Sequence, residues 1–323
     1  MRRSDRPFKS LRLLLEVFGS RLGLRVLPYC SRRVIRALAM TAGWVGWALA
    51  GALRRVAMAN VNIVFGPSLP PARQRALVRS AFQTMALACL DLFWFTYRRT
   101  ERLQQYVRID PSIDQHVLPL PVIGVTAHFG NWEIIAQALA LRGLRHVAVA
   151  APLANPAVDV LFNRMRTDAG MEIIPRQGAV RGLIRALKDK KAVALLLDQN
   201  TKPEEGGVFV DFFGLPVPMS VAAAVLACRM NVRIIPLFCR VDPEGVYTLY
   251  AQPAIPPVPA PDKIQADSVH QAVTQQIAHA FQQEIRARPE QWLWMYKRWK
   301  HQWPPGASAQ FPFYSKPYAA PVS

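Results

Sequence analysis

The stretch that decides the fold is Pro121-Val-Ile-Gly-Val-Thr-Ala-His-Phe-Gly-Asn-Trp-Glu133. Its first six residues, up to Thr126, are an apolar run of the length of a buried β-strand. Residues 134–141 are apolar enough for a buried helix, and Asn131 is suited to be its N-cap. The stretch therefore predicts a strand, a sharp turn at Gly130 and a helix, which together form the repeating unit of an α/β sheet.

A histidine and a carboxylate lie close together in this stretch. His128 follows the predicted strand, and Glu133 lies five residues on, in the first turn of the helix. The spacing predicts that both come within reach of each other at the strand ends, where open α/β sheets bind their ligands. A histidine oriented by a carboxylate can take the proton of a hydroxyl, so we expect His128 to be a general base supported by Glu133. The alternative is a buried structural histidine that donates to a backbone carbonyl.

Strand and helix patterns alternate through the middle of the chain. Besides 121–126 and 132–141, the sequence predicts strands at 147–151, 171–175, 192–197, 232–240 and 246–251, and helices at 157–169, 180–188, 220–229 and 267–287. This alternation predicts an α/β fold with a mixed, largely parallel sheet flanked by helices. We expect a helical, basic, membrane-associated region over 1–100, an α/β domain over 101–305 and a disordered tail over 306–323.

The charge of the chain is concentrated near its N-terminus. The 323 residues carry a formal net charge of +19, and 51% of them are hydrophobic. Residues 1–100 hold seventeen Lys/Arg against three acidic residues, a net charge of +14 in that part alone. The arginines alternate there with long apolar runs, which favours an anionic membrane surface over nucleic acid as a partner.

Residues 37–53 form a charge-free run of 17 residues with arginines on both sides. This length is at the short limit of a transmembrane helix. An interfacial helix with Trp44 and Trp47 near the lipid headgroups fits the run about as well. A buried core helix is the third alternative. The run therefore predicts membrane association without deciding whether it spans the bilayer or lies on it.

Four cysteines and six histidines are scattered along the chain without Cys-x-x-Cys or other metal-ligand spacing. Free thiols in a reducing compartment are the simplest interpretation. We accordingly expect chemistry that needs neither a metal nor another cofactor.

The residues from Thr126 to Glu133 resemble the His-x4-Asp/Glu motif of the glycerolipid acyltransferase superfamily, in the form found in the bacterial late acyltransferases of lipid A biosynthesis. Three further stretches are similar to that family in the same order: 198–200, 207–214 and 288–294. The resemblance covers roughly residues 50–305. It implies a fold like that of glycerol-3-phosphate acyltransferase. It also implies transfer of a fatty acyl chain from acyl carrier protein to a hydroxyl of a lipid A precursor, with that hydroxyl as the nucleophile.

The resemblance also implies residues that bind the substrates. Arg166 and Arg176 match paired arginines of the family, and a guanidinium can hold a phosphate through two hydrogen bonds. Asn131 is a candidate donor to the oxyanion of the reaction. Asp198 matches the first carboxylate of the family's Asp-Gln/His-Asp pattern, whereas Asn200 replaces the second one. The alternatives are a solvated helix face for the arginines and a turn-forming role for Asp198.

Two apolar stretches have two interpretations each. Val208–Phe213 resembles part of the family's acyl-chain pocket, and a core strand is equally consistent with it. Trp292, Trp294, Trp299 and Trp303 are interleaved with basic residues, which predicts either a membrane-interface segment or a basic closing helix packed on the sheet.

The resemblance implies three partners: acyl carrier protein, an anionic glycolipid acceptor and the inner membrane. No nucleic acid is expected as a partner. The implied location is the cytoplasmic face of the cell inner membrane. Two other functions remain open. One is acyl transfer from acyl-CoA or acyl carrier protein to a glycerophospholipid or another glycolipid. The other is a non-catalytic membrane-binding protein that keeps the fold.

Overall fold

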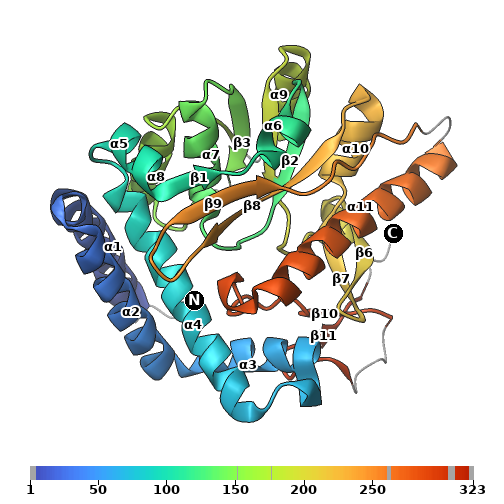
Figure 1. Ribbon diagram of the computed structural model, residues 1–323. Coiled ribbons are helices and arrows are strands. Elements are labelled where there is room, and N and C mark those ends of the chain that lie inside the picture. The colour runs from blue at the N-terminus through green and yellow to red at the C-terminus, as the bar shows by residue number, and fades with distance from the viewer. Residues whose placement is uncertain (1–4, 151, 176, 260–262, 305–309, 320–323) are drawn as a thin grey trace.

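Helices and strands alternate in the computed structural model, which describes residues 5–150, 152–175, 177–259, 263–304 and 310–319 (Figure 1). The α-helices are α1 (Asp5–Val26), α2 (Arg32–Leu49), α3 (Gly51–Phe65), α4 (Pro71–Trp94), α5 (Arg99–Tyr106), α6 (Ser112–Val117), α7 (Trp132–Leu141), α8 (Pro156–Thr167), α9 (Ala179–Lys188), α10 (Ala222–Met230) and α11 (Lys263–Ala287). The strands are β1 (Val107–Ile109), β2 (Val122–Thr126), β3 (His146–Ala150), β4 (Glu172–Pro175), β5 (Ala192–Leu196), β6 (Gly207–Phe212), β7 (Leu215–Ser220), β8 (Ile234–Val241), β9 (Tyr247–Ala251), β10 (His301–Gln302) and β11 (Lys316–Pro317). Four short 3₁₀ turns, η1 (Leu27–Tyr29), η2 (Gly66–Ser68), η3 (Pro203–Glu205) and η4 (Pro289–Gln291), connect them.

Seven strands form one sheet in the order β1-β9-β8-β2-β5-β3-β4. β8 pairs antiparallel with β9, and the other five pairings are parallel. β2 lies at the centre of this order, and four of its five residues are buried, as its uninterrupted apolar sequence predicts. The predicted mixed, largely parallel sheet flanked by helices is confirmed.

Helices cover both faces of the sheet (Figure 1). On one side, Leu183 of α9 and Ile277 of α11 belong to the same buried cluster as Val193 of β5. On the other side, Ile134 of α7 packs in a second cluster with Ile235 of β8. The sheet is therefore the middle layer of a three-layer arrangement, which explains why its central strands are apolar on both faces.

The N-terminal helices share this core. Val61 of α3 and Phe82 of α4 lie in the same cluster as the strand residues. α2 lies against α4 at Gly43, where a Cβ atom would come within 2.4 Å of the Cα of Gln83. The helical region predicted over 1–100 is therefore packed onto the α/β part.

The apolar run 37–53 is bent. α2 ends at Leu49 and α3 begins at Gly51, and the two helices together make an apolar pair bent by 93°. Among the described helices, α4 is the one that is by itself long and apolar enough to cross a membrane, and 39% of its most apolar window is buried inside the protein. α1 and α2 meanwhile expose large apolar side chains, including Phe18, Trp44 and Leu49.

Two predictions about the C-terminal part are wrong. Trp292, Trp294 and Trp299 are at most 2% exposed, whereas Trp303 is 38% exposed. All four lie in the segment 292–303 after η4, which the structure describes throughout and which contains no helix, so they form no closing helix, and the three buried rings form no membrane-interface segment. The tail is not disordered over residues 310–319. β11 pairs with β10 there, and the hydroxyl of Tyr318 donates to Glu204 at 2.6 Å. Burial of aromatic rings stabilises both segments, because each ring removes a large apolar area from water.

Candidate active site

The candidate site is formed at the carboxyl ends of β2 and β5, which are parallel neighbours. Thr126 is paired with Leu196 there. His128 and Asp198 each lie two residues beyond this pair, so the sheet brings them together. Nδ1 of His128 is 2.7 Å from Oδ1 of Asp198, and the backbone N–H of His128 donates to Oδ2 at 3.0 Å.

Asp198 is a buried carboxylate, 2% exposed, with three hydrogen-bond donors. The third donor is the indole N–H of Trp292, at 2.9 Å from Oδ2. Burial alone would raise the pKa of Asp198, but the charge and hydrogen bonds of His128 and the bond from Trp292 hold it below its ordinary value. Because an ionised carboxylate only accepts hydrogen bonds, it fixes the tautomer of His128 that carries a proton on Nδ1 and leaves Nε2 as an acceptor.

The lowered pKa of Asp198 predicts how stability depends on pH. A carboxylate whose pKa is lower in the folded state stabilises the fold above the unfolded pKa of about 3.9, and this contribution is lost as pH falls through the folded pKa. We expect Asp198→Asn to lower the free energy of unfolding at pH 7 by about 1.5–3 kcal/mol, the usual worth of a hydrogen bond to a charged group. The difference in free energy of unfolding between the variant and wild type should narrow below about pH 4. Denaturant unfolding at several pH values measures this difference. A difference that is unchanged at the lowest pH at which both proteins fold would contradict the prediction.

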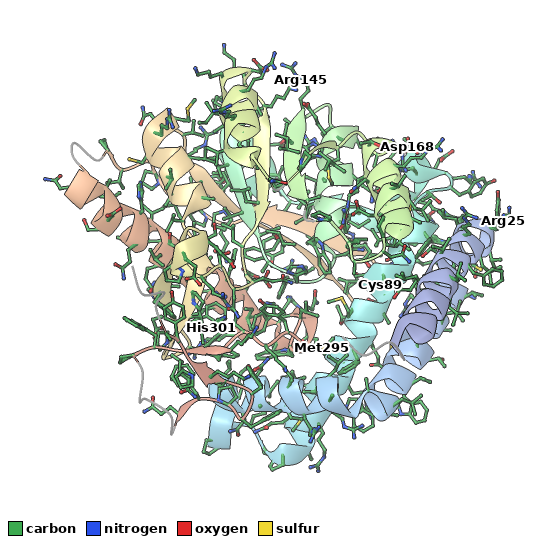
Figure 2. The ribbon with its side chains drawn as sticks, turned by 180° about the vertical axis from the view of Figure 1, so that it is seen from behind. Arg25, Cys89, Arg145, Asp168, Met295 and His301 are labelled. Atoms are coloured by element: carbon green, nitrogen blue, oxygen red, sulfur yellow. The ribbon has the colours of Figure 1, made fainter. Side chains whose placement is uncertain are left out.

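The Nε2 side of the ring lies on the accessible side of the site. The His128 side chain is 15% exposed, its ring meets that of Trp132 edge-on at 4.7 Å between centroids, and Nε2 is 3.4 Å from the side-chain nitrogen of Gln199. Figure 2 labels Arg145, which directly precedes β3, at one end of the strands, and Met295, which follows Trp292 in the chain, toward the other. The carboxyl ends of the parallel strands therefore lie on the Met295 side of the sheet.

The loop that carries His128 is fixed on both sides by backbone hydrogen bonds. The N–H of Gly130 donates to the carbonyl of Gln291 at 2.8 Å, and the N–H of Leu293 donates to the carbonyl of His128 at 3.1 Å. Gly130 has a φ of +55°, and a Cβ atom there would lie 1.9 Å from the carbonyl oxygen of Cys239. Only glycine fits this turn, which explains the residue between His128 and α7.

Glu133 does not orient the His128 ring, so that prediction is wrong. Its carboxylate accepts two hydrogen bonds from the guanidinium of Arg166 on α8, at 3.0 Å from Nε and 2.5 Å from Nη2. Such a planar two-bond pair is the preferred geometry between arginine and a carboxylate, and it directs Glu133 toward α8 and away from the imidazole. Burial alone would lower the pKa of Arg166, but Glu133 raises it above the ordinary value. Arg166 is thus a cation that Glu133 of α7 holds in place.

Asn131 also differs from its predicted role. It stands at the N-cap position of α7, but its side chain makes no capping bond and is 1% exposed. Its amide nitrogen donates at 3.3 Å to the hydroxyl of Tyr247, which donates to Asp91, and Asp91 pairs with Arg32 of α2. Burial and the charge of Asp91 raise the pKa of Tyr247, so its hydroxyl keeps its proton. A buried chain of polar groups therefore links α2 to the loop that carries His128.

Removing Asp91 should destabilise the protein strongly. Both partners of the Arg32–Asp91 pair are buried, with side chains 6% and 0% exposed. Asp91→Ala would leave the guanidinium buried without its counter-charge, so we expect the free energy of unfolding to fall by about 3–5 kcal/mol. Denaturant unfolding in detergent measures the change. The control is Asp114→Ala, which breaks the exposed pair with Arg142 and should cost at most about 1 kcal/mol. Equal losses in the two variants would contradict this account.

The other predicted residues have separate outcomes. Arg176 lies outside the described residues. Asn200 stands where the family's pattern has its second carboxylate. It accepts a hydrogen bond from Arg298 at 2.8 Å and donates to the carbonyl of Lys297 at 3.1 Å. Within the described residues, no group of three or more His, Cys, Asp or Glu side chains could hold a metal ion.

Sequence reasoning missed Gln199 and Trp292 as parts of the site. Gln199 directly follows Asp198, and Trp292 lies in one of the stretches that resemble the family. Nothing in their spacing places them in the site, because Gln199 contacts His128 across 71 residues of chain and Trp292 contacts Asp198 across 94.

Comparison with known proteins gives several similar acyltransferases. Lipid A biosynthesis acyltransferase 2 of Shigella flexneri is 24% identical over 290 residues, covering 87% of each chain. The lipid A biosynthesis myristoyltransferase of Escherichia coli (strain K12) is 25% identical over 254 residues, covering 76% of this chain and 74% of that enzyme. A phosphatidylinositol mannoside acyltransferase of Mycobacterium tuberculosis is 30% identical over 188 residues, covering 57% of this chain and 54% of that enzyme, so the match spans about half the length of that relative.

Among solved structures, the crystal structure of the 1-acyl-sn-glycerophosphate acyltransferase PlsC from Thermotoga maritima matches with a TM-score of 0.35 and 12% identity, covering 78% of this chain and 98% of that one. The sequence profile of the bacterial lipid A biosynthesis acyltransferases matches residues 7–301. This match includes the helical region, the sheet and every described residue of the candidate site, and on it the chain belongs to the bacterial lipid A biosynthesis acyltransferase family.

Proposed function

We propose that this chain is an O-acyltransferase that moves a fatty acyl chain from an acyl-carrier-protein thioester to a hydroxyl of a lipid A precursor. The observation that carries the proposal is the His128–Asp198 pair, in which a buried carboxylate holds Nδ1 at 2.7 Å and leaves Nε2 on the accessible side. Family membership supports the reaction class, and the geometry of the pair supports His128 as the base that this reaction needs.

His128 would act as the general base. Nε2 takes the proton of the acceptor hydroxyl while the oxygen attacks the thioester carbonyl, which forms the new C–O bond. The tetrahedral intermediate then collapses, the C–S bond breaks, and the proton returns from Nε2 to the leaving sulfur. Asp198 would stabilise the imidazolium between these steps by its negative charge at Nδ1. No serine or cysteine of the chain is needed, because the acceptor supplies the nucleophile.

The developing oxyanion needs donors close to Nε2. The side-chain nitrogen of Gln199 lies 3.4 Å from Nε2 and is one candidate. The first backbone N–H groups of α7 are another, since they have no acceptor within the helix. Asn131 holds the loop through Tyr247 in this proposal, and Arg166 and Arg176 remain candidates for the phosphates of donor or acceptor.

The N-terminal helices would hold the enzyme on the cytoplasmic face of the inner membrane. Phe18, Trp44 and Leu49 expose apolar area, and the first 100 residues carry a net charge of +14. Together these favour an anionic bilayer surface. The same positive charge would speed the encounter with acyl carrier protein, which is acidic.

A second candidate differs in the acceptor. The 30% identity to a phosphatidylinositol mannoside acyltransferase favours transfer to another glycolipid, with acyl-CoA or acyl carrier protein as the donor. The same base and the same proton path would serve it, because both acceptors present a hydroxyl group as the nucleophile.

Acyl transfer in detergent micelles tests the proposal. Purified protein is given acyl-carrier-protein and CoA thioesters of several chain lengths, with either a Kdo-bearing tetra-acylated lipid A precursor or a phosphatidylinositol mannoside. Mass spectrometry reads the gain of one acyl group. Transfer from acyl carrier protein to the lipid A precursor supports the proposal. Preferred transfer to the mannoside supports the second candidate, and no transfer with any pair favours a non-catalytic membrane protein.

A further inference from the structure

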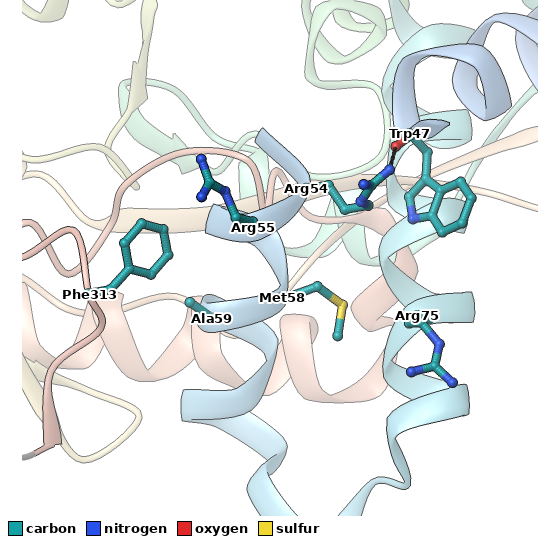
Figure 3. Close-up of a pocket in the computed structure, with 7 residues that line it drawn as sticks. All are labelled: Trp47, Arg54, Arg55, Met58, Ala59, Arg75 and Phe313. Atoms are coloured by element: carbon teal, nitrogen blue, oxygen red, sulfur yellow. Dashed lines mark hydrogen bonds between the residues drawn. The ribbon is translucent and has the colours of Figure 1, made fainter. Parts of the chain in front are cut away.

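A pocket of about 580 Å³ lies at the bend between α2 and α3, lined by Trp47, Arg54, Arg55, Met58, Ala59, Arg75 and Phe313 (Figure 3). This volume is in the range of small-molecule and lipid sites. The lining combines three guanidinium groups with the apolar side chains of α2, α3 and the C-terminal segment, and it contains no acidic residue. None of these residues belongs to the His128 site.

The three arginines are not equivalent. Arg54 donates to the carbonyls of Trp47 and Ala48 at 2.6 and 3.0 Å, and its guanidinium lies 5.2 Å from the Trp47 ring centroid. It thus satisfies carbonyl groups at the end of α2 and fixes the bend. Arg55 and Arg75 are exposed, and within the described part of the chain neither has a hydrogen bond or an ion pair. Two unpaired cations therefore remain at the pocket for a ligand.

The apolar part of the pocket adjoins the exposed apolar surface. Trp47, Met58 and Phe313 contribute two aromatic rings and a thioether to the pocket. Leu49 and Leu53, which lie between Trp47 and Arg54 in the chain, are 80% and 48% exposed. The indole N–H of Trp47 is buried and has no partner among the described residues. Cations at the rim of an apolar pocket are suited to a ligand with a polar anionic head and an apolar chain.

We propose that this pocket binds one phosphate-bearing membrane phospholipid, with its phosphate at one of the rim arginines, Arg55 or Arg75, and the start of an acyl chain over Met58 and Phe313 (Figure 3). This inference rests on the membrane association in the proposed function. Charge complementarity selects the phosphate, because a guanidinium can hold two of its oxygens. The adjoining exposed leucines place the pocket where the proposed membrane face meets the headgroups. The site is distinct from acyl transfer, since the lipid is retained and not modified.

Vesicle binding tests the charge requirement. Wild-type protein should bind vesicles of phosphatidylcholine with phosphatidylglycerol more tightly than vesicles of phosphatidylcholine alone. Arg55→Gln/Arg75→Gln should weaken binding to the mixed vesicles by about thirtyfold at low ionic strength. The matched control is Arg181→Gln/Arg185→Gln, the same charge change on exposed positions of α9 at the far side of the protein (Figure 1). An equal loss in the control would overturn the proposal.

A pocket-filling variant separates a defined site from general surface attraction. Ala59→Phe adds a ring inside the pocket and leaves the charge unchanged. Native mass spectrometry from detergent should find one anionic phospholipid on wild type and on the α9 control, and none on Ala59→Phe or Arg55→Gln/Arg75→Gln. A lipid retained by Ala59→Phe would overturn the proposal. So would an arginine variant that keeps its vesicle affinity but has a raised KM for the acyl acceptor, because the occupant would then be the acceptor. Binding is read without turnover, so failure of acyl transfer leaves this test intact.

Discussion

Replacement of His128 by alanine is expected to lower the rate of acyl transfer by about two to four orders of magnitude, the usual scale for losing a general base. The variant removes Nε2, the acceptor for the hydroxyl proton, and Asp198 lies behind the ring, on its Nδ1 side. Gln199, which lies 3.4 Å away, carries an amide that is not basic. Initial rates at saturating donor measure the loss, and we expect it in kcat with little change in KM, because the proton moves only in the transition state.

The control for this variant is His279→Ala. His279 is exposed on α11, so the same substitution there removes an imidazole far from the site. Thermal unfolding of both variants checks that they remain folded. The proposed mechanism is refuted if transfer by folded His128→Ala is as fast as transfer by the His279 control.

Asp198→Asn should have a comparable effect, roughly 10³- to 10⁴-fold in kcat, as when the orienting carboxylate of a hydrolase triad is made neutral. The amide removes the negative charge that stabilises the imidazolium. In the wild type, the two Asp198 oxygens accept hydrogen bonds from the His128 ring, the His128 backbone N–H and the Trp292 indole. The side-chain amide of the Asp198→Asn variant can instead donate an N–H to Nδ1 of the ring. The imidazole would then prefer the tautomer with its proton on Nε2, which cannot act as a base.

Two further variants make this test specific. Asp189→Asn, at the exposed end of α9, is the matched control and should keep wild-type activity. Glu133→Gln addresses the other carboxylate. We expect it to disturb Arg166 and lower the rate, while the shape of the pH–rate profile stays that of wild type because Asp198 still holds the ring. A profile changed by Glu133→Gln and unchanged by Asp198→Asn would reverse the assignment of the two carboxylates.

Local patterns in the sequence were sufficient for the elements that surround the site. α7 has the same bounds as the helix predicted at 132–141. β2 covers the strand predicted at 121–126 except for residue 121. The segment 100–116 had no such pattern. It forms α5, the three-residue β1 and α6, and β1 is a strand because it pairs with β9, where Val107 lies opposite Tyr247. Such short strands depend on a distant partner and leave no periodicity to detect.

The sequence by itself determined the α/β fold and the turn at Gly130 and indicated His128 as the proposed base, because apolar strands, polar strand ends and glycine turns are local properties. Only the tertiary structure decided which carboxylate lies against the His128 ring. β5 follows β3 and β4 in the chain but lies between β2 and β3 in the sheet. This insertion aligns Thr126 with Leu196 and so places Asp198 beside His128. Glu133 is nearer in sequence, yet α7 turns it to Arg166 on α8. Sequence separation does not determine which strands become neighbours, whereas the packing of the connecting helices on the two faces of the sheet does.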